Sequence, residues 1–544
     1  MSSSKNVLLL TGGEGHDFAS MAKFLRDLAE RHGWKVTATE DRAVLSSLSA
    51  SAYAAIVVCT QGGELTTEQG RGLVEFVKRG GGFLGIHGAA ASWRGNSDYM
   101  AMLGCRLLQR VAPLEFEVEP KDAEHPVSRH IRRFQVQTEL YQMEITASDY
   151  RTLLQTYWQG KIEPVVCVRE FGKGRVFYIS LGHTVEDFQN SEWQTLFLRA
   201  LRWSTGQQEK PVPKGGVIGY GGAFNMGRHH LNAMKTVGMV PVAACDIDPA
   251  RMKAAAVDFP DIQTYTNPAE MLAKSDAELL TVILPHNAHA KMVIEVLNSG
   301  RHCVVEKPMA ITSDEVEAMI AAAEKNKRLL SVYHNRRWDG DFLAIEHVVT
   351  HRKMLGDIFK VEIGMSGYGS PGGWWRSHKE ISGGIHYDWG AHFMYWALQL
   401  IDSPIDWVVA TAQKRVWLQV SNEDHLDAYV RFKNGCILEV EASNIAKIDK
   451  PRWRILGAKG AILDRGKDAF ELSLHQLGVN NESPMRVRYY PHQSIRYYEN
   501  VVDHLRLDDP MEVTARKSAR VIHLLHTMDR AARSGRQERV PGED

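Results

Sequence analysis

Short apolar runs and amphipathic stretches alternate along the chain, and the alternation starts twice. Residues 7–10 and 56–59 are continuous apolar runs, and residues 18–31 carry apolar side chains at helical spacing. Repeated alternation of strand and helix predicts a parallel sheet covered by helices. A polar stretch with two prolines at 206–214 interrupts the pattern, which indicates a short joint between two independently folded parts.

The second alternation begins at Gly216 and predicts a Rossmann-type sheet up to residue 335. From residue 406 onward, segments of alternating polarity predict a large, mostly antiparallel sheet, and a helix at 514–533 closes the chain. We therefore expect an α/β chain with four parts. They are a flavodoxin-like parallel-sheet domain at 1–205, a linker at 206–214, a Rossmann dinucleotide-binding domain at 215–335, and an α+β substrate and oligomerisation domain at 336–544.

Composition narrows the range of partners. The 65 Lys and Arg residues balance 65 Asp and Glu residues, so bulk charge recruits neither nucleic acid nor anionic membrane. The six cysteines form no Cys-x-x-Cys pair, which is typical of reduced core residues in a cytosolic protein. The apolar run at 7–10 is too short for a signal peptide, and no run reaches transmembrane length. We expect a soluble, cytoplasmic protein.

A glycine-rich turn, Gly219-Tyr220-Gly221-Gly222, follows the first strand of the second alternation. Glycines let backbone N–H groups approach a pyrophosphate at the start of the next helix, here near Met226. Phe224 stands where a third glycine is usual, and Gly227 comes three residues later. The loop is therefore longer than standard, with Asn225 as a candidate N-cap or phosphate contact.

Asp246 ends the second strand of this sheet, and no arginine follows it directly. A carboxylate at this place accepts hydrogen bonds from the adenosine ribose hydroxyls and repels a 2′-phosphate. The sequence therefore predicts NAD as the cofactor in preference to NADP.

The sequence Glu306-Lys307-Pro308 follows an apolar run at 302–305. Ligands bind at the carboxyl ends of the strands in such sheets, so we expect Lys307 to reach the site. Asp388 and His392 lie four residues apart in a stretch with helical spacing at 388–400, which would bring both to one face of a helix. A histidine titrates near neutrality, so His392 is the best candidate for a general base.

The glycine turn, Glu-Lys-Pro and Asp-x-x-x-His, in that order, resemble the Gfo/Idh/MocA family of nicotinamide-dependent sugar and cyclitol oxidoreductases over about the last 330 residues. The resemblance implies that Lys307 holds the reacting oxygen, that His392 takes its proton, and that Asp388 orients substrate or tunes His392. It also implies a homodimer or homotetramer formed through the outer face of the C-terminal sheet. The expected cofactor contacts are Gly219, Gly221, Gly222, Phe224, Asn225, Met226, Asp246, Pro285, His286, His289, Glu306 and Lys307.

Some positions depart from the family pattern or leave alternatives open. Tyr395 stands where many members have an acid, and Ser382 replaces the first of three glycines. His386, just before Asp388, is an extra titratable group that could reach a sugar. For His289, packing of the turn at a helix start is an equal alternative to a cofactor contact.

A glycine-rich loop at 368–376 carries Trp374, Trp375 and Arg376. Aromatic faces pack against sugar C–H groups, and an arginine binds hydroxyls, so these three are candidate substrate contacts together with His386. The alternative is that the tryptophans only hold the loop down.

In the first domain, Gly85-Ile86-His87-Gly88-Ala89 has the outline of a nucleophile elbow. Its central residue is His, so it cannot form an acyl-enzyme, and a working amidotransferase or hydrolase of that kind is excluded. Together with Gly12-Gly13, His125-Pro126, Glu139-Leu140-Tyr141 and Gly182-His183-Thr184, this elbow resembles a ThuA-type domain, a relative of the glutamine-amidotransferase fold associated with sugar utilisation, over residues 7–205.

Five polar residues of this domain sit at strand ends or in the following loops: His16, Asp17, His87, Glu139 and His183. Convergence on one edge of the sheet would make them a polar substrate pocket. No His-x-x-x-His spacing occurs in this domain, so we expect no metal there. The alternatives are that the histidines only satisfy loop backbones and that the domain is a catalytically silent appendage.

These features together predict an NAD-dependent enzyme that oxidises a ring hydroxyl, at C3 by the sugar-utilisation resemblance, of a sugar or glycoside. The ThuA-like domain would process or receive the keto-sugar. One alternative is an NAD-dependent, redox-neutral glycosidase, which needs a further base such as His386 or Tyr395. The other is a non-catalytic, NAD-bound sugar sensor.

Overall fold

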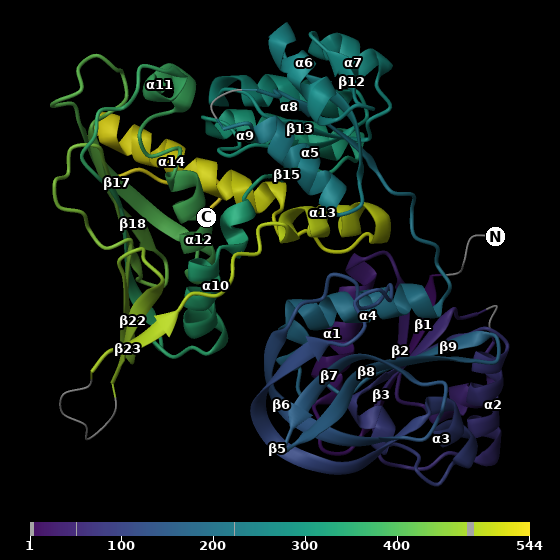
Figure 1. Cartoon of the computed structure of the whole chain (residues 1–544). Helices are drawn as coiled ribbons and strands as arrows, with labels where there is room; N and C mark the ends of the chain where they lie inside the picture. The colour runs from purple at the N-terminus through teal and green to yellow at the C-terminus, as the bar shows by residue number, and fades with distance from the viewer. Residues whose placement is uncertain (1–4, 50–51, 222–223, 476–482, 544) are drawn as a thin grey trace. The chain divides into compact units, whose positions relative to one another are not determined.

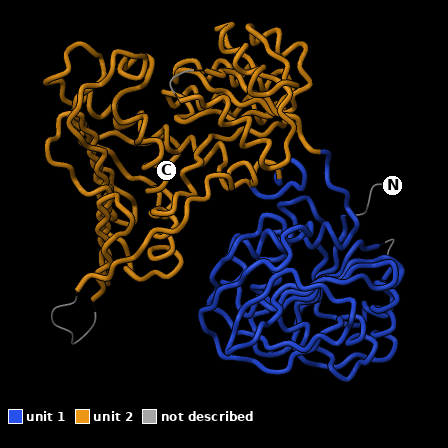
Figure 2. Tube along the Cα trace, in the orientation of Figure 1, with its two compact units in different colours: residues 1–211, 503–510 blue, residues 212–502, 511–544 orange. Residues whose placement is uncertain are grey.

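The computed structural model describes residues 5–49, 52–221, 224–475 and 483–543. These fall into two compact units (Figures 1 and 2). The first unit comprises Met1–Pro211 with Asp503–Pro510, and the second comprises Val212–Val502 with Met511–Asp544. The chain passes from one to the other between Pro211 and Val212, within the proline-containing stretch. No helix among the described residues is long and apolar enough to cross a membrane.

A nine-stranded sheet in the order β2-β1-β3-β4-β9-β8-β7-β5-β6 forms the centre of the first unit. Its parallel half confirms the predicted parallel-sheet domain and contains β1 (Asn6–Gly13), β2 (Lys35–Thr39), β3 (Ala55–Gln61), β4 (Gly82–Ile86) and β9 (Gly174–Ile179). The other half is antiparallel and contains β5 (Cys105–Pro120), β6 (Phe134–Ile145), β7 (Arg151–Trp158) and β8 (Lys161–Phe171).

Strand β1 shows why the apolar runs become buried parallel strands. Its side chains alternate between two cores, with Val7 and Leu9 on one face and Leu8 and Leu10 on the other. The first core is closed by α1 (Phe18–Arg31) and α4 (Ser191–Ser204), and the second by α2 (Thr67–Lys78) and α3 (Ser97–Leu103) (Figure 1).

The second unit contains two sheets, as predicted. The first is a fully parallel six-stranded Rossmann sheet in the order β12-β11-β10-β13-β14-β15. Its strands are β10 (Lys214–Ile218), β11 (Val240–Cys245), β12 (Gln263–Tyr265), β13 (Leu279–Val282), β14 (His302–Val305) and β15 (Leu330–Val332). The strand order reverses between β10 and β13, and ligands bind at such a switch point, beyond the carboxyl ends of the strands.

Helices of this Rossmann domain connect successive strands. They are α5 (Met226–Thr236), α6 (Pro249–Asp258), α7 (Pro268–Lys274), α8 (His289–Asn298) and α9 (Ser313–Asn326), with the short turn η4 (His286–Ala288) before α8.

The second sheet has eight strands in the order β17-β18-β19-β16-β20-β21-β22-β23. It is antiparallel apart from the β16–β19 pair, which confirms the predicted mostly antiparallel sheet. The strands are β16 (Ile358–Ser366), β17 (Ile405–Gln413), β18 (His425–Phe432), β19 (Ile437–Ser443), β20 (Trp453–Gly457), β21 (Gly460–Asp464), β22 (Ala469–Leu474) and β23 (Met485–Arg488).

Two helices are packed together beside this sheet, α12 (Gly390–Leu400) and the chain-closing α14 (Ala515–Ser534) (Figure 1). The other helical elements are η5 (Asn335–Trp338), α10 (Gly340–Glu346), η7 (Trp375–Ser377), α11 (Lys379–Ser382) and α13 (Arg496–Leu507).

Candidate active site

Lys307 stands just past the carboxyl end of β14, and its neighbour Glu306 fixes the backbone there. The Glu306 carboxylate accepts a hydrogen bond from Lys307 N at 3.0 Å and lies 3.1 Å from His230 Nε2 on α5. His230 in turn lies 2.8 Å from the hydroxyl of Tyr498. Both Glu306 oxygens therefore have protein partners, and one of them holds the backbone of Lys307. The predicted cofactor contact of Glu306 stays a prediction.

Asp388 holds two cations on one carboxylate oxygen. Lys307 Nζ donates to its Oδ1 at 2.5 Å, and Arg376 Nη1 donates to the same atom at 2.7 Å. Burial raises the pKa of Asp388, but the charges of Lys307 and Arg376 outweigh burial and lower it to about 2. Two positive charges facing one negative charge leave the site net positive, which suits a developing alkoxide.

His392 lies in the first turn of α12 and is almost fully buried. The helix begins at Gly390, so Asp388 precedes it in a turn, and the predicted helix start at 388 was two residues too early. Burial and then the charge of Lys307 hold the pKa of His392 well below its usual value, so the ring is neutral at pH 7. Its Nδ1 has no hydrogen-bond partner among the described residues.

His334 adjoins this histidine and was missed by sequence reasoning. It follows β15, and its ring centroid lies 6.2 Å from that of His392 and 4.4 Å from that of Tyr395. Burial and the charge of Lys307 lower the pKa of His334 to about 3. Its position at the carboxyl end of a parallel strand is the signal that would have found it.

The tryptophan loop brings Arg376 to Asp388. The guanidinium carbon of Arg376 lies 4.8 Å from the ring centroid of Trp375 and 5.2 Å from that of Trp374. Phe224, beside the glycine turn, is 5.4 Å from the same guanidinium. The loop and the glycine turn therefore meet over the Lys307–Asp388 pair, and both tryptophans are half-buried.

His386 does not share this arrangement. It is fully buried, and its Nε2 donates to the carbonyl oxygen of Leu525 on α14 at 3.1 Å. Burial lowers the pKa of His386, the charges of Glu423 and Asp529 act against burial, and the charge of Lys379 lowers the pKa further. Burial against α14 does not favour the predicted substrate contact, which stays a prediction.

The glycine turn is built for close approach. Gly219 has φ of +98°, and a Cβ there would lie 1.9 Å from the Ile283 carbonyl oxygen. A Cβ on Gly227 would lie 2.5 Å from Tyr220 Cα, so Gly227 fills the role of the missing third glycine. Gly222 lies outside the described residues.

The start of α5 is open to a phosphate. Asn225 is the N-cap by position, with Met226 next, but its side chain makes no cap hydrogen bond within the described chain. The first N–H groups of the helix therefore remain for an anion.

Asp246 follows β11 beside the turn. Its Oδ2 accepts hydrogen bonds from Tyr220 N at 2.9 Å and Gly221 N at 3.0 Å. A carboxylate at this strand end meets the ribose of a dinucleotide whose pyrophosphate rests on α5. Residues and backbone geometry here thus fit NAD or a close relative.

After β13, Pro285 leads into two buried histidines with different surroundings. His286 Nδ1 lies 2.8 Å from the Ser382 carbonyl, and its Nε2 has no partner among the described residues. Burial, followed by the neighbouring His289, lowers the pKa of His286 to about 3. His289 has carbonyl oxygens near both ring nitrogens, Pro308 at 2.9 Å and Leu284 at 2.8 Å. It ties the loop to the Lys-Pro turn, which supports the packing alternative over the cofactor contact.

In the first unit, four of the five predicted pocket residues converge at the carboxyl edge of the sheet. His87 Nε2 lies 3.3 Å and His183 Nδ1 lies 3.4 Å from Glu139 Oε2. The His16 ring centroid is 5.4 Å from that of His87 and 4.9 Å from that of His183. His87 has φ of +42° just after β4, the sharp turn that the elbow outline predicts. Asp17 is not part of the cluster, because its Oδ1 caps α1 at Ser20 N (3.0 Å).

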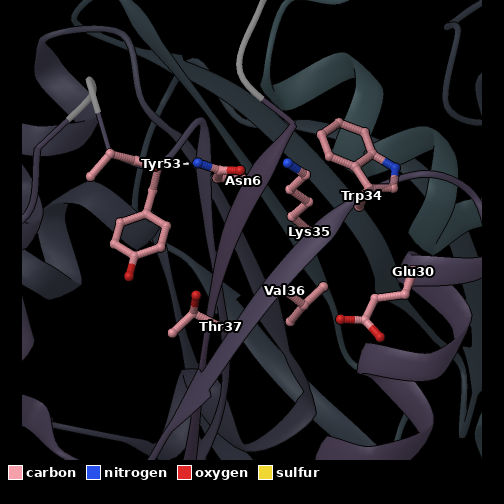
Figure 3. A pocket seen from close by; sticks show the side chains of 8 residues that line it. Asn6, Glu30, Trp34, Lys35, Val36, Thr37 and Tyr53 are labelled. Carbon is pink, nitrogen blue, oxygen red and sulfur yellow. Dashed lines mark hydrogen bonds between the residues drawn. The ribbon is translucent and has the colours of Figure 1, made fainter.

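An open groove lies at the opposite edge of this sheet, near the amino ends of β1, β2 and β3 (Figure 3). Asn6, Trp34, Lys35 and Tyr53 line it, together with Glu30 on α1. Parallel sheets bind ligands at their carboxyl edge, so the groove is not a candidate site.

Comparison with known proteins agrees with both units. Residues 6–204 match the ThuA family, described as trehalose utilisation. Residues 214–334 match the oxidoreductase family with an NAD-binding Rossmann fold, and residues 346–463 match the GFO/IDH/MocA C-terminal domain.

Among curated relatives, an uncharacterised oxidoreductase of Schizosaccharomyces pombe is 30% identical over 224 residues, which are 40% of this chain and 61% of that protein. The scyllo-inositol 2-dehydrogenase (NADP(+)) of Bacillus subtilis is 24% identical, over 62% of this chain and 97% of that enzyme. Among solved structures, an NAD-binding protein from Listeria innocua is 26% identical with a TM-score of 0.53, over 61% of this chain and 98% of that one. The chain is therefore a fusion of a ThuA-like domain with a Gfo/Idh/MocA family oxidoreductase.

Proposed function

We propose that the second unit oxidises a ring hydroxyl of a sugar or glycoside with NAD. The observation that carries the proposal is the Lys307–Asp388–Arg376 cluster beside a neutral, buried His392, at the ligand-binding edge of a Rossmann sheet. The name of the Bacillus subtilis relative, an inositol dehydrogenase, supports a ring hydroxyl as the reacting group.

Oxidation of a secondary alcohol requires removal of a proton from oxygen and of a hydride from carbon. Bound NAD supplies the hydride acceptor. Neutral His392 accepts the hydroxyl proton, and the Lys307 ammonium donates a hydrogen bond to the oxygen as negative charge develops there. Asp388 orients Lys307, and Arg376 compensates the carboxylate when Lys307 turns to substrate.

Substrate specificity would come from the loop that carries Trp374, Trp375 and Arg376. Indole faces suit the C–H faces of a pyranose, and Arg376 lies within reach of hydroxyls next to the reacting one. We place the oxidation at C3, so a 3-deoxy glucoside should be inert while the parent glucoside reacts.

For the cofactor we propose NAD, on the strength of the Asp246 carboxylate beside the turn. The position of Arg251 is a reason to test NADP as well. Arg251 on α6 lies against the glycine turn: a Cβ on Gly221 would be 2.2 Å from Arg251 Cδ. A cation so close to the turn could pair with a 2′-phosphate, and the Bacillus subtilis relative is named for NADP(+).

The redox-neutral glycosidase is less favoured, because its two candidate bases hydrogen-bond to backbone carbonyls of other segments. His386 bonds to α14, and the Tyr395 hydroxyl points to the Glu512 carbonyl at 3.5 Å. The sensor alternative is disfavoured by the assembled Lys307, Asp388 and His392. A homodimer or homotetramer stays a prediction, which the mass of the protein in solution tests.

The function is tested by mixing the full chain with NAD and a panel of glucosides and free sugars. We expect NADH absorbance to accumulate with at least one substrate and to be lost in His392→Ala. Release of aglycone without net NADH would support the glycosidase. Bound NAD with neither product would support the sensor and overturn the catalytic roles.

For the first unit, we propose that it processes or receives the keto-sugar. The convergence of His16, His87, Glu139 and His183 at its ligand-binding edge supports this role over a silent appendage.

A further inference from the structure

Unpartnered side-chain atoms in the first unit point at one another. Within the described residues, His87 Nε2, His183 Nδ1 and Glu139 Oε2 have no hydrogen-bond partner. Only 2% of the His87 side chain is exposed, and 15% of that of Glu139. Buried polar atoms in native proteins are almost always paired, so three orphan atoms around one point call for a missing partner.

The tautomer of His87 shows what that partner must be. Its Nδ1 lies 2.7 Å from the Ser180 carbonyl oxygen, to which it must donate, because a carbonyl can only accept. Nε2 then presents a lone pair to a carboxylate oxygen at 3.3 Å. Two acceptors facing each other repel unless a cation or a second proton lies between them.

The spacing of the atoms favours a metal ion. Zinc bonds of about 2.0–2.1 Å in tetrahedral geometry place neighbouring ligand atoms about 3.3–3.4 Å apart. The separations from Glu139 Oε2 to His87 Nε2 and His183 Nδ1 are 3.3 and 3.4 Å. One ring nitrogen from each of His16, His87 and His183 also lies within 4.8 Å of the other two.

His16 has the features of a further ligand. Its Nδ1 lies 2.8 Å from the His183 carbonyl, to which it donates, leaving Nε2 as an acceptor. The Gln61 amide lies 2.7 Å from this Nε2, and the amide orientation that satisfies both neighbours puts its nitrogen on His16 and its oxygen on Arg110. A carbonyl partner on the second ring nitrogen is the usual support of a metal-binding histidine, and His16 and His87 both have one.

We propose that the first unit binds one divalent transition-metal ion, through His87 Nε2, His183 Nδ1, Glu139 Oε2 and His16 Nε2, the last exchanging Gln61 for the ion. A set of three imidazoles and one carboxylate suits Zn²⁺ and its substitute Co²⁺. This revises the expectation of no metal. No sequence spacing reveals the site, because its ligands come from the ends of β1, β4 and β9 and from the middle of β6.

Solvent reaches the site from one side, so a bound ligand could add a fifth oxygen ligand to the four from the protein, as zinc sites that expand to five-coordinate do. The His183 side chain is 23% exposed, and His16 is half-buried. A metal here can polarise an oxygen of a bound ligand, and the carbonyl of a keto-sugar is the oxygen we assign to it. That ligand assignment rests on the proposed function, whereas the metal site itself does not.

The test uses the full chain, stripped with a chelator and titrated with Zn²⁺ or Co²⁺ alone. We expect one equivalent to bind, Co²⁺ to give visible absorption, and Zn²⁺ to raise the unfolding temperature. His87→Ala and Glu139→Gln should each weaken binding more than about 100-fold, since removal of a ligand costs more than removal of an outer partner. Asp17→Asn is the matched control, because it neighbours His16 but only caps α1, and Asn caps equally well.

Three results would overturn the proposal. The first is no stoichiometric binding at micromolar metal, which would leave a bridging proton as the missing partner. The second is metal affinity that His87→Ala leaves unchanged. The third is a loss of metal affinity in Asp17→Asn equal to that in the ligand variants. If His87→Ala does not fold by circular dichroism, Glu139→Gln and His183→Ala decide.

The keto-sugar ligand has its own readout. Added keto-glucoside should shift the Co²⁺ spectrum of the wild-type chain, and an unchanged spectrum would overturn that assignment. Failure to form NADH, with Co²⁺ still bound, would count against the proposed function and leave the metal site standing.

Discussion

At the scale of single residues, Lys307 has two proposed roles, and a substitution can test them without unfolding the protein. Lys307 pairs with the Asp388 carboxylate, and in the proposed reaction it also stabilises the alkoxide. We expect Lys307→Met to lower kcat by about 10²–10³-fold, the loss typical of removing one oxyanion partner. The control is Lys253→Met, a change of the same chemistry at an exposed position on α6. NAD binding should persist in both variants, and near-normal turnover in Lys307→Met would contradict the assigned role.

The buried His392 predicts an unusual pH profile. Because burial and the Lys307 charge lower the pKa of His392 well below 6.5, the ring stays a free base in mild acid. Asp388, with a pKa of about 2, stays ionised there too. The acid limb of kcat/KM should therefore lie well below pH 6.5, and in Lys307→Met it should move upward, since the repelling charge is gone. A wild-type limb near pH 6.5 would be incompatible with this account.

Asp246 should control cofactor choice. Removing a charged hydrogen-bond partner of the ribose in Asp246→Ala should raise KM for NAD by about 10-fold or more and make NADP a usable cofactor. Asp246 also bonds the turn backbone, so a loosened turn would weaken both cofactors alike. The NAD-to-NADP ratio of kcat/KM separates the two effects, with Asp248→Asn, which keeps its helix cap, as the control.

At the scale of elements, the glycine turn and α5 act as one cradle. A methyl group on Gly227 would meet the backbone of Tyr220 at 2.5 Å, so Gly227→Ala must push the helix away from the turn. We expect destabilisation of about 1–3 kcal/mol and weaker NAD binding by fluorescence titration. Gly367→Ala, where a Cβ meets nothing within 4 Å, should change neither quantity. Equal behaviour of the two variants would refute the cradle.

Helices and strands with a clear pattern of apolar residues could be predicted from the sequence. A strand buried on both faces is a continuous apolar run, and a strand buried on one face alternates apolar and polar residues. The apolar runs became β1 and β14, and the mostly antiparallel sheet followed from alternation. The antiparallel half of the first sheet was missed, since its long strands alternate weakly and expose much of one face. The start of α12 was missed by two residues, because Asp388 continues the helical spacing without joining the helix.

For the site, sequence motifs named Lys307, Asp388 and His392 as candidates, and the structure brings Lys307 and Asp388 into contact. Motifs do not give the direction in which a side chain points. His386 and His289 lie next to functional residues in sequence, yet both bond to backbone carbonyls elsewhere. The His16, His87 and His183 convergence was anticipated only as a pocket, because distances between residues so far apart exist only in the folded sheet.

At the scale of the whole molecule, buried neutral histidines should make the second unit acid-sensitive. The pKa of both His286 and His334 is lowered to about 3 in the fold, so below the unfolded value of 6.5 the unfolded chain takes up protons that the fold does not. Stability should therefore fall as pH drops from 6.5 toward 3, by about 1.4 kcal/mol per pH unit for each histidine. In His334→Gln the slope should decrease by that amount in urea titrations, and an unchanged slope would contradict it.

The central claim is that a ring C–H of a sugar passes its hydride to the nicotinamide in the second unit. The most direct measurement is the transfer of deuterium from a ring-deuterated glucoside to NAD, followed by mass spectrometry of the cofactor. The account predicts deuterated NADH from the wild-type chain and none from His392→Ala. Unlabelled cofactor, with both NAD and sugar bound, would contradict it.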